Sequence, residues 1–153
     1  PSLGVVPTRQ VSVHLSRGPG RIPVFGEGAP FSYYGFPAYA GAGFKIGIHV
    51  TGPEGDPVDP AQRRATAAEI ARLVEQAARR FPETAGAEVG SADVCFYEMT
   101  GSGDPVVARL DDHTVACTGF SGHGFKFAPV VAAAAGDLVL GGSPAIPLDR
   151  FAP

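Results

Sequence analysis

The sequence predicts an α+β fold, with a mixed or antiparallel sheet and flanking helices followed by a C-terminal strand–helix segment. Three observations favour this fold. Short β-branched or aromatic runs bounded by Gly and Pro recur along the chain, one central segment has helical hydrophobic spacing, and a glycine-rich turn near the end leads from a strand into an apolar run. The 153 residues fit one ordinary domain, and the hydrophobic content of 44% is too high for a disordered chain.

The first half of the chain predicts three strands. Residues 9–15 (RQVSVHL) and 31–37 (FSYYGFP) have strand composition, and the Gly- and Pro-rich segment between them is typical of turns. Residues 43–51 (GFKIGIHVT) alternate as in a half-buried strand, with Lys45 and His49 on the less apolar face. From the residues alone, we expect that face to point to solvent.

The residue pattern between Thr66 and Pro82 predicts the most regular helix of the chain. Thr66 and Glu69 have the spacing of a capping box, and Pro82 marks the end of the helix. The apolar residues behind the cap recur at helical spacing: Ile70, Leu73, Val74, Ala77 and Phe81. We expect this helix to serve packing rather than chemistry.

Three more strands are expected before the end of the chain. Residues 87–100 (AEVGSADVCFYEMT) form a strand in which Cys95 and Tyr97 share a face, because side chains two apart in a strand point the same way. Residues 104–110 and 113–120 follow, joined by a short polar turn. The last of these strands runs directly into the glycine-rich turn.

That turn, residues 119–128 (GFSGHGFKFA), precedes a closing helix. Glycines at this density let a backbone approach a flat or phosphorylated ligand, and Lys126 stands where the helix begins, a place that favours anions. Pro129 fits only the first helical turn, and Gly141 fits its C-terminal end. The order strand, glycine loop, helix indicates a cradle for a phosphate or a ring, although the pattern is a weak signal alone.

Charge, cysteine content and missing motifs exclude several other classes. Charged residues make up 18% of the chain and the net charge is −3, so we expect neither a nucleic acid nor an anionic membrane as partner. No segment is apolar and long enough to span a bilayer, and two distant cysteines with no secretion signal favour reduced thiols in the cytoplasm. The sequence completes no dinucleotide fingerprint, no metal-ligand spacing and no nucleophile elbow. The expected partner is a small molecule or another protein.

Three motifs carry a resemblance to a known family. CFYEMT (95–100), GFSGHGFKFAP (119–129) and the upstream GFPAYAGAGFKIGIH (35–49) together resemble the C-terminal half of the monomeric sarcosine oxidase family, which includes N-methyltryptophan oxidase, within the D-amino-acid-oxidase-like flavoproteins. The resemblance runs from about Val6 to Phe151, nearly the whole chain.

The resemblance implies how the chain is organised. Members of that family have an N-terminal FAD-binding domain of Rossmann type, whose glycine fingerprint is missing here. Residues 1–100 would be a portion of the substrate-binding domain, and residues 101–153 the C-terminal segment that completes the FAD-binding domain. The chain would then work in a hetero-oligomer with a polypeptide carrying the N-terminal FAD-binding domain, unless the sequence is a fragment of one longer chain.

The resemblance also implies a flavin site. Cys95 stands where the family attaches FAD covalently to the 8α carbon of the isoalloxazine ring, whereas Cys117 keeps the ordinary interpretation of a lone cysteine as a small buried hydrophobe. The backbone amides that would cradle the pyrimidine edge of the ring belong to Gly122, His123, Gly124 and Phe125.

Further positions match the family's substrate and oxygen chemistry. Lys126 matches the lysine that pairs with the substrate carboxylate, and Tyr97 a residue that shapes the substrate pocket. Lys45 matches the catalytic lysine that faces flavin N5 through a water, and His49 a second active-site position. A fixed cation stabilises the superoxide that forms when O₂ takes up an electron, so this implication replaces the solvent-facing interpretation of Lys45.

The expected function is that of a component of an FAD-dependent oxidase. It would oxidise the C–N bond of a secondary or cyclic amino acid to an imine and reduce O₂ to H₂O₂. Two alternatives stay open: a non-catalytic carboxylate-binding module built on Lys126, and a flavin dehydrogenase that passes electrons to an acceptor other than oxygen.

Overall fold

The computed structural model describes residues 3–28 and 33–153, which form two compact units. One unit comprises Arg9–Phe96, and the other comprises Pro1–Thr8 together with Tyr97–Pro153. The roles assigned above to residues 1–100 and 101–153 stay predictions.

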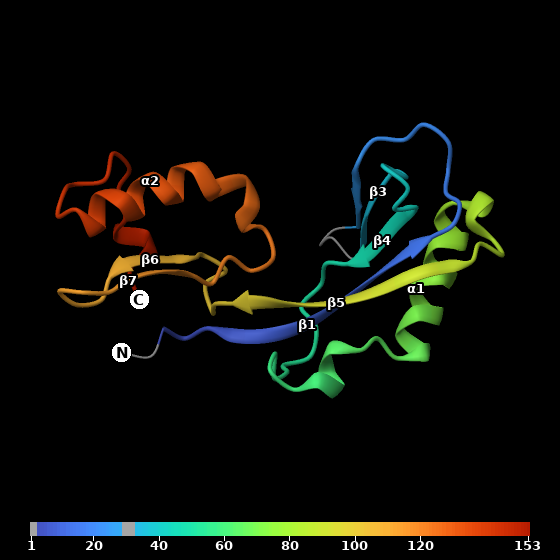
Figure 1. The fold of residues 1–153 in the computed structure, drawn as a ribbon, viewed down its shortest axis with the longest axis horizontal. Helices are drawn as coiled ribbons and strands as arrows, with labels where there is room; N and C mark the ends of the chain where they lie inside the picture. Colours follow the sequence, from blue (N-terminus) through green and yellow to red (C-terminus); the bar gives the residue numbers. More distant parts are fainter. Residues whose placement is uncertain (1–2, 29–32) are drawn as a thin grey trace. The chain divides into compact units, whose positions relative to one another are not determined.

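An antiparallel sheet organises the first of these units (Figure 1). Its five strands are β1 (Val6–Leu15), β2 (Phe25–Glu27), β3 (Tyr33–Phe36), β4 (Phe44–Ile48) and β5 (Val89–Met99), in the order β2-β3-β4-β1-β5. Antiparallel registers join β2 to β3, β3 to β4, and β4 to β1. The sheet and its helix confirm the predicted α+β class.

Two local predictions about this sheet are wrong. The segment between residues 15 and 31 contains β2, although its composition predicts only turns. Phe25 explains the strand, because its ring packs against Phe44 at a centroid distance of 6.2 Å and Phe81 at 5.0 Å, contacts that local composition does not encode. β4 ends at Ile48, so His49 lies just beyond the strand. The predicted strand 31–37 falls partly on residues outside the described ranges.

The helix α1 (Ala67–Arg80) begins at the predicted capping box. The backbone N–H of Glu69 donates to Oγ1 of Thr66 at 3.3 Å, and the backbone N–H of Thr66 donates to Oε2 of Glu69 at 2.7 Å. Pro82 follows Phe81, the C-cap residue, whose N–H donates to the Ala77 carbonyl. Both predicted ends of the helix are confirmed.

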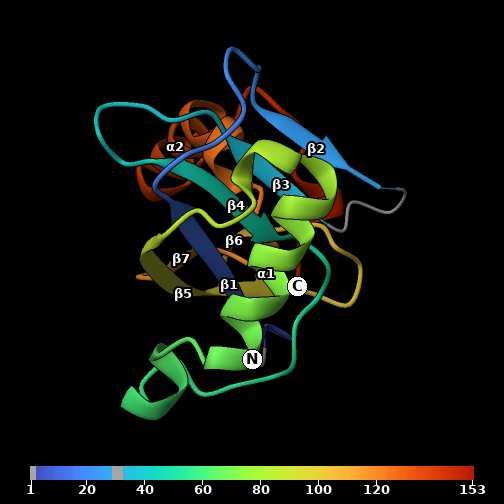
Figure 2. The same cartoon turned by 90° about the vertical axis from the view of Figure 1, so that its right-hand side faces the viewer.

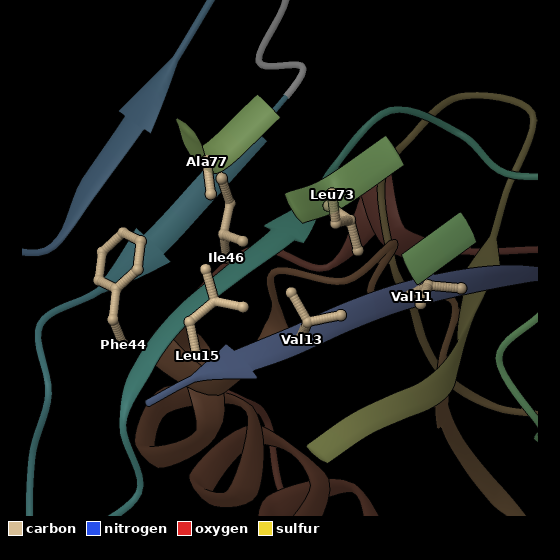
Figure 3. Close-up of a cluster of buried hydrophobic side chains, with 7 residues drawn as sticks. All are labelled: Val11, Val13, Leu15, Phe44, Ile46, Leu73 and Ala77. Atoms are coloured by element: carbon tan, nitrogen blue, oxygen red, sulfur yellow. The ribbon is translucent and has the colours of Figure 1, made fainter. Parts of the chain in front are cut away.

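The hydrophobic core lies between α1 and one face of the sheet (Figure 2). Leu73 and Ala77 of α1 are fully buried and face side chains of β1 and β4. The sheet residues of this cluster, drawn in Figure 3, are Val11, Val13, Leu15, Phe44 and Ile46. Because strand side chains alternate, His14 of β1 and Lys45 of β4 belong to the opposite face.

A hairpin and a helix make up most of the second unit (Figure 1). β6 (Val106–Arg109) pairs antiparallel with β7 (Val115–Thr118), and α2 (Ala128–Val139) packs on both strands. The predicted strands and closing helix are confirmed, with Pro129 in the first helical turn and Gly141 in a left-handed conformation just past the end. Short 3₁₀ turns complete the chain at Pro60–Arg63, Pro82–Thr84, Gly124–Phe127 and Asp149–Phe151.

Apolar side chains of this second unit are unusually accessible. Only Ala134 of α2 is buried, whereas Val139 is 65% exposed and Leu140, the C-cap residue, 86%. Cys117 is exposed, so its interpretation as a buried hydrophobe is wrong; β7 pairs only with β6 in the described chain, and a two-stranded hairpin encloses little. In the described ranges, neither helix has the length and apolar composition needed to cross a membrane.

Candidate functional site

Lys45 lies on the sheet face that α1 leaves uncovered. It is half-buried, and the strand registers place it opposite His14 of β1 and Phe36 of β3. Its Nζ lies 5.9 Å from the centroid of the Tyr34 ring and 6.0 Å from that of Phe36. Such contacts between an ammonium and ring faces are attractive. Within residues 3–28 and 33–153, no carboxylate forms an ion pair with Lys45.

Tyr34 brings Lys45 and His49 into one group. Its position in β3 is directly opposite Gly47 of β4, the residue midway between the two basic side chains. The ring of His49 stands edge-on to the Tyr34 ring at 6.1 Å. The structure therefore keeps Lys45 and His49 together, as their spacing predicts, and adds Tyr34. No sequence pattern indicates Tyr34, because its position beside Lys45 and His49 depends on the register of β3 against β4.

Cys95 of β5 is exposed and carries a free thiol. Neighbouring atoms nevertheless shield the sulfur: burial raises the pKa of the Cys95 thiol, the positive charge of Lys45 lowers it in part, and Asp93 raises it further. Lys45 and Cys95 are thus within electrostatic range of each other in this unit. Because the thiolate is the nucleophilic form of cysteine, the charge of Lys45 favours reaction at this sulfur.

His14 adds a polar cluster beside these residues that the sequence did not predict. Its Nδ1 lies 3.0 Å from Oγ of Ser91 and 3.3 Å from Oδ2 of Asp93. Two adjoining hollows of about 500 and 220 Å³ both include His14 in their walls, and the smaller also includes Lys45 and Tyr39. The alternation around Cys95 places Asp93 on the face of the cysteine, which is the only sequence signal that points to this cluster.

In the other unit, the glycine-rich turn is tied to the end of β5. Oε2 of Glu98 accepts hydrogen bonds from Oγ1 of Thr118 at 2.9 Å and from the backbone N–H of Gly119 at 3.1 Å. The carbonyl of Glu98 accepts from the N–H of Ser121 at 3.1 Å. Glu98 lies between Tyr97 and Met99 in the motif that carries the resemblance, but no sequence pattern predicts its hydrogen bonds to the turn.

Tyr97 and Gly122 meet in this turn. Gly122 has a left-handed φ of 78°, and a Cβ there would collide with the Tyr97 ring. Gly124 is similarly close to Phe120, whose side chain a Cβ would meet at 2.6 Å. The backbone of the turn therefore packs tightly because these positions have no side chain.

The residues that follow differ sharply in exposure. His123 has a buried Nδ1 without a hydrogen-bond partner among the described residues, and its ring stands 6.4 Å from that of Phe127. Lys126 is exposed, with Nζ 5.0 Å from the Phe127 ring centroid. Phe125 is 95% exposed. The turn thus presents a cation, a ring and an unsatisfied imidazole nitrogen within a few residues.

A mostly apolar cavity of about 430 Å³ lies next to this turn in the same unit. His123 and Phe127 contribute to its wall, as do residues of α2 and β6. Arg150 and Asp104, which form an ion pair at 2.7 Å, also line it. For metals, in contrast, the described part of the chain offers no cluster of three or more His, Cys, Asp or Glu side chains.

These residues suit a flavin in chemical terms. A planar ring system with polar edges needs backbone amides on a turn without obstructing side chains, a hydrogen-bonding group for a ring atom, and a cation for negative charge that develops there. The tight turn at Gly122 and the Nδ1 of His123, which has no hydrogen-bond partner among the described residues, meet the first two needs. Lys126 adds an exposed ammonium. On the sheet, Cys95 offers a free thiol, and Lys45 an ammonium that forms no ion pair within the described ranges.

Comparison with known proteins decides the family. Residues 1–138 match the FAD dependent oxidoreductase (DAO) family. The chain belongs to this family. It is 36% identical over 126 residues to monomeric sarcosine oxidase of Streptomyces avermitilis, covering 78% of this chain and 32% of the relative. It is 34% identical over 163 aligned positions to N-methyl-L-tryptophan oxidase of Salmonella typhi, covering 99% of this chain and 42% of the relative. The resemblance inferred from the motifs is confirmed.

Solved structures share the fold. L-proline dehydrogenase from P. horikoshii superposes with a TM-score of 0.78 at 20% identity, covering 99% of this chain and 40% of the other. Glycine oxidase from Geobacillus kaustophilus gives 0.77 at 23% identity, with 99% and 39% covered. The chain thus spans less than half the length of each of these four proteins.

Proposed function

We propose that this chain is a component of an FAD-dependent oxidase that oxidises the C–N bond of a secondary or cyclic amino acid to an imine and reduces O₂ to H₂O₂. The observation that carries the proposal is the state of Lys45, an ammonium held against two ring faces with no carboxylate partner among the described residues, in electrostatic range of Cys95. An unpaired, half-buried cation is suited to stabilise negative charge developing on oxygen. The names of the relatives, sarcosine oxidase and N-methyl-L-tryptophan oxidase, support a secondary amino acid as substrate.

FAD, when bound, supplies the two-electron redox chemistry of this reaction. Cys95 is the proposed attachment point, through a thioether to the 8α carbon of the ring. The residues proposed to contact the pyrimidine edge are Gly122, His123, Gly124 and Phe125. Support comes from the tight backbone at Gly122 and from the buried Nδ1 of His123, which lacks a partner in the described chain.

Lys126 is proposed to bind the substrate carboxylate. Its ammonium is exposed, rests near the Phe127 ring and stands just before α2, so an anion can reach it. Tyr97 is proposed to shape the substrate pocket, and His49 to act beside Lys45. The edge-on packing of His49 on Tyr34 supports a fixed orientation of its imidazole.

A polypeptide carrying the N-terminal FAD-binding domain is the proposed partner. The chain covers only 32% and 42% of the two relatives described above, and apolar residues of the second unit, such as Val139 and Leu140, are exposed. Exposed apolar surface of this kind favours a protein contact. The two free cysteines support a reducing, cytoplasmic location.

The test is to express the chain together with the remaining N-terminal portion of its Streptomyces avermitilis relative. We expect a yellow complex whose denatured mass exceeds that of this chain by one FAD, and which releases H₂O₂ with sarcosine, N-methyl-L-tryptophan or proline. A colourless complex that still binds these amino acids would instead indicate a carboxylate-binding module.

A variant separates the oxidase from a dehydrogenase. In Lys45→Met, we expect the flavin to be reduced by substrate under nitrogen as before but to be reoxidised by O₂ at a much lower rate. Lys126→Met is the matched control, because it removes the other lysine and should weaken substrate binding while leaving reoxidation intact. Unchanged reoxidation in Lys45→Met would favour a dehydrogenase.

A further inference from the structure

The ammonium of Lys45 is held near two aromatic rings rather than by a carboxylate of the described residues. Every ion pair of the described ranges uses an arginine or a histidine; the basic partners are Arg9, His14, Arg79, Arg80 and Arg150. Lys45 instead has two ring faces near its Nζ, those of Tyr34 and Phe36. A lysine side chain is long and flexible, so an ammonium without a carboxylate partner keeps one position only if something else restrains it.

The register of β3 on β4 explains why the Tyr34 ring is available for this. Tyr34 stands directly opposite Gly47, where a Cβ would lie 2.8 Å from Cε1 and Cζ of the ring and from the hydroxyl oxygen Oη. Real Cβ atoms do not approach other heavy atoms that closely, so any side chain at position 47 would displace the ring. The Tyr34 ring therefore packs directly over Gly47, because that position has no side chain.

In this position over Gly47, the Tyr34 ring lies near both Lys45 and His49. Lys45 and His49 flank Gly47 two residues away on either side, and the Tyr34 centroid is 5.9 Å from Nζ of the first and 6.1 Å from the ring centroid of the second. His49 lies past the end of β4, where the sheet no longer fixes its direction. Its edge-on contact with the Tyr34 ring is one restraint on the imidazole at this position.

Phe36 supports the arrangement from the other side. It is the cross-strand partner of Lys45, and its ring stands perpendicular to that of Tyr34 at 6.1 Å. Phe36 is 42% exposed, whereas Tyr34 is half-buried. Contacts between cations and rings strengthen as water is removed, so Tyr34 is the stronger restraint.

We propose that Tyr34, packed over Gly47, is a positioning residue that holds Lys45 and His49 in their working orientation, and that the Phe36 ring is a second contact for Lys45. Its significance for oxygen chemistry rests on the proposed function, in which Lys45 is the cation that meets the anionic oxygen species. The ring restrains the ammonium without neutralising it, whereas a carboxylate would cancel the charge that the reaction uses.

The test needs no flavin, because the chain has only two lysines, Lys45 and Lys126. Reductive methylation of the full chain with ¹³C-formaldehyde labels both and keeps their charge, so NMR reports each ammonium separately. The face of the Tyr34 ring should shift the methyl signal of Lys45 upfield. Tyr34→Leu should remove that shift and leave the Lys126 signal in place, while Tyr34→Phe, which keeps the ring, should retain it.

Glycine variants provide a second, independent arm. Gly47→Ala should displace the ring and move the Lys45 signal, whereas Gly20→Ala, where a Cβ would meet nothing within 4 Å, should leave it unchanged. Where Tyr34→Leu does not fold, Phe36→Leu at the more exposed ring takes its place, with a smaller shift expected. A Lys45 signal that is the same in folded Tyr34→Leu or Gly47→Ala as in the parent chain overturns the proposal.

In a flavin-containing complex, Tyr34→Leu should slow reoxidation by O₂ by about twofold to fivefold, the fold-change that corresponds to loss of one contact between a cation and a ring. The rate at which substrate reduces the flavin should be the same in Tyr34→Leu as in the parent complex. The two failures are distinguishable: absence of flavin from every complex refutes the proposed function and leaves the NMR result intact, while an unmoved Lys45 signal refutes the positioning role and leaves the oxidase proposal standing.

Discussion

The guanidinium of Arg9 joins β1 to the segment that leads into α1, and replacing it by Met should cost far more stability than replacing any exposed arginine. Arg9 donates through Nε to the Gln62 carbonyl at 2.7 Å and through Nη2 to the Arg64 carbonyl at 2.6 Å. It also forms an ion pair with Glu69, the capping-box residue of α1. The side chain of Arg9 is 11% exposed and that of Glu69 31%.

The magnitude follows from these contacts. A hydrogen bond to a charged group contributes about 1.5–3 kcal/mol, and breaking a buried ion pair costs about 3–5 kcal/mol because the remaining charge is left unpaired. In Arg9→Met, Glu69 keeps some contact with water and with Thr66, which reduces the cost of leaving its charge unpaired. We therefore expect Arg9→Met to lower the free energy of unfolding by about 2–4 kcal/mol. The matched control is Arg79→Met, whose helical pair with Glu75 is 69% and 71% exposed and should cost no more than about 0.5 kcal/mol.

Urea unfolding followed by circular dichroism measures both changes. The pH dependence provides a second check. Burial alone would raise the pKa of Glu69, but its hydrogen bonds with Arg9 and Thr66 outweigh burial, so the pKa lies below its ordinary 4.5. A carboxyl with a lowered folded-state pKa contributes stability above its unfolded pKa and loses it as the pH falls through the folded value. The difference between the parent and Arg9→Met should therefore narrow below about pH 4.5. A cost for Arg9→Met no larger than that of Arg79→Met would refute the reasoning.

Two further outcomes are expected. Lys45→Met should raise the pKa of the Cys95 thiol further, because the positive charge that stabilises the thiolate is lost. In a chain whose Cys117 is replaced by Ser, this change should slow the alkylation of Cys95 by iodoacetamide at neutral pH. An unchanged pH dependence of the alkylation rate would contradict the electrostatic link between Lys45 and Cys95. Gly122→Ala should destabilise the turn by about 1–3 kcal/mol, through its left-handed φ and its clash with the Tyr97 ring, whereas Gly101→Ala, which meets no neighbour within 4 Å, should be nearly neutral in the same urea titration.

Sequence reasoning succeeded where the signal is local. The capping box at Thr66 and the apolar spacing behind it fix α1, because a helix satisfies its backbone hydrogen bonds within its own segment. It failed where the signal is a contact between distant residues. The strand β2 exists because Phe25 packs on Phe44 and Phe81, and three residues are too few to show a strand period.

The same division applies to the candidate site. The roles carried over from the motifs stay predictions. The spacing of Lys45 and His49 predicted that they share a face, and both lie against the Tyr34 ring although β4 ends at Ile48. Tyr34, His14 and Asp93 were missed because their relevance depends on which strand lies beside which, and in what register. Composition also misjudged Cys117: a lone cysteine is usually buried, but burial requires neighbours on both sides, and β7 has only one neighbouring strand in the described chain.

The two lysines differ from the arginines in a way that bears on function. Arginine offers a rigid fork that matches a carboxylate, and here arginines pair with carboxylates, as Arg9 does with Glu69 and Arg150 does with Asp104. Each lysine instead has its ammonium near an aromatic ring, at 5.9 Å from Tyr34 for Lys45 and 5.0 Å from Phe127 for Lys126, and neither has an ion-pair partner in the described ranges. A ring restrains a cation without cancelling its charge, so both ammonium groups keep their electrostatic attraction for an incoming anion. The proposed reaction has two anions to stabilise, the substrate carboxylate and the reduced oxygen species. A separate lysine with an uncancelled charge is proposed for each, Lys126 for the carboxylate and Lys45 for the oxygen species.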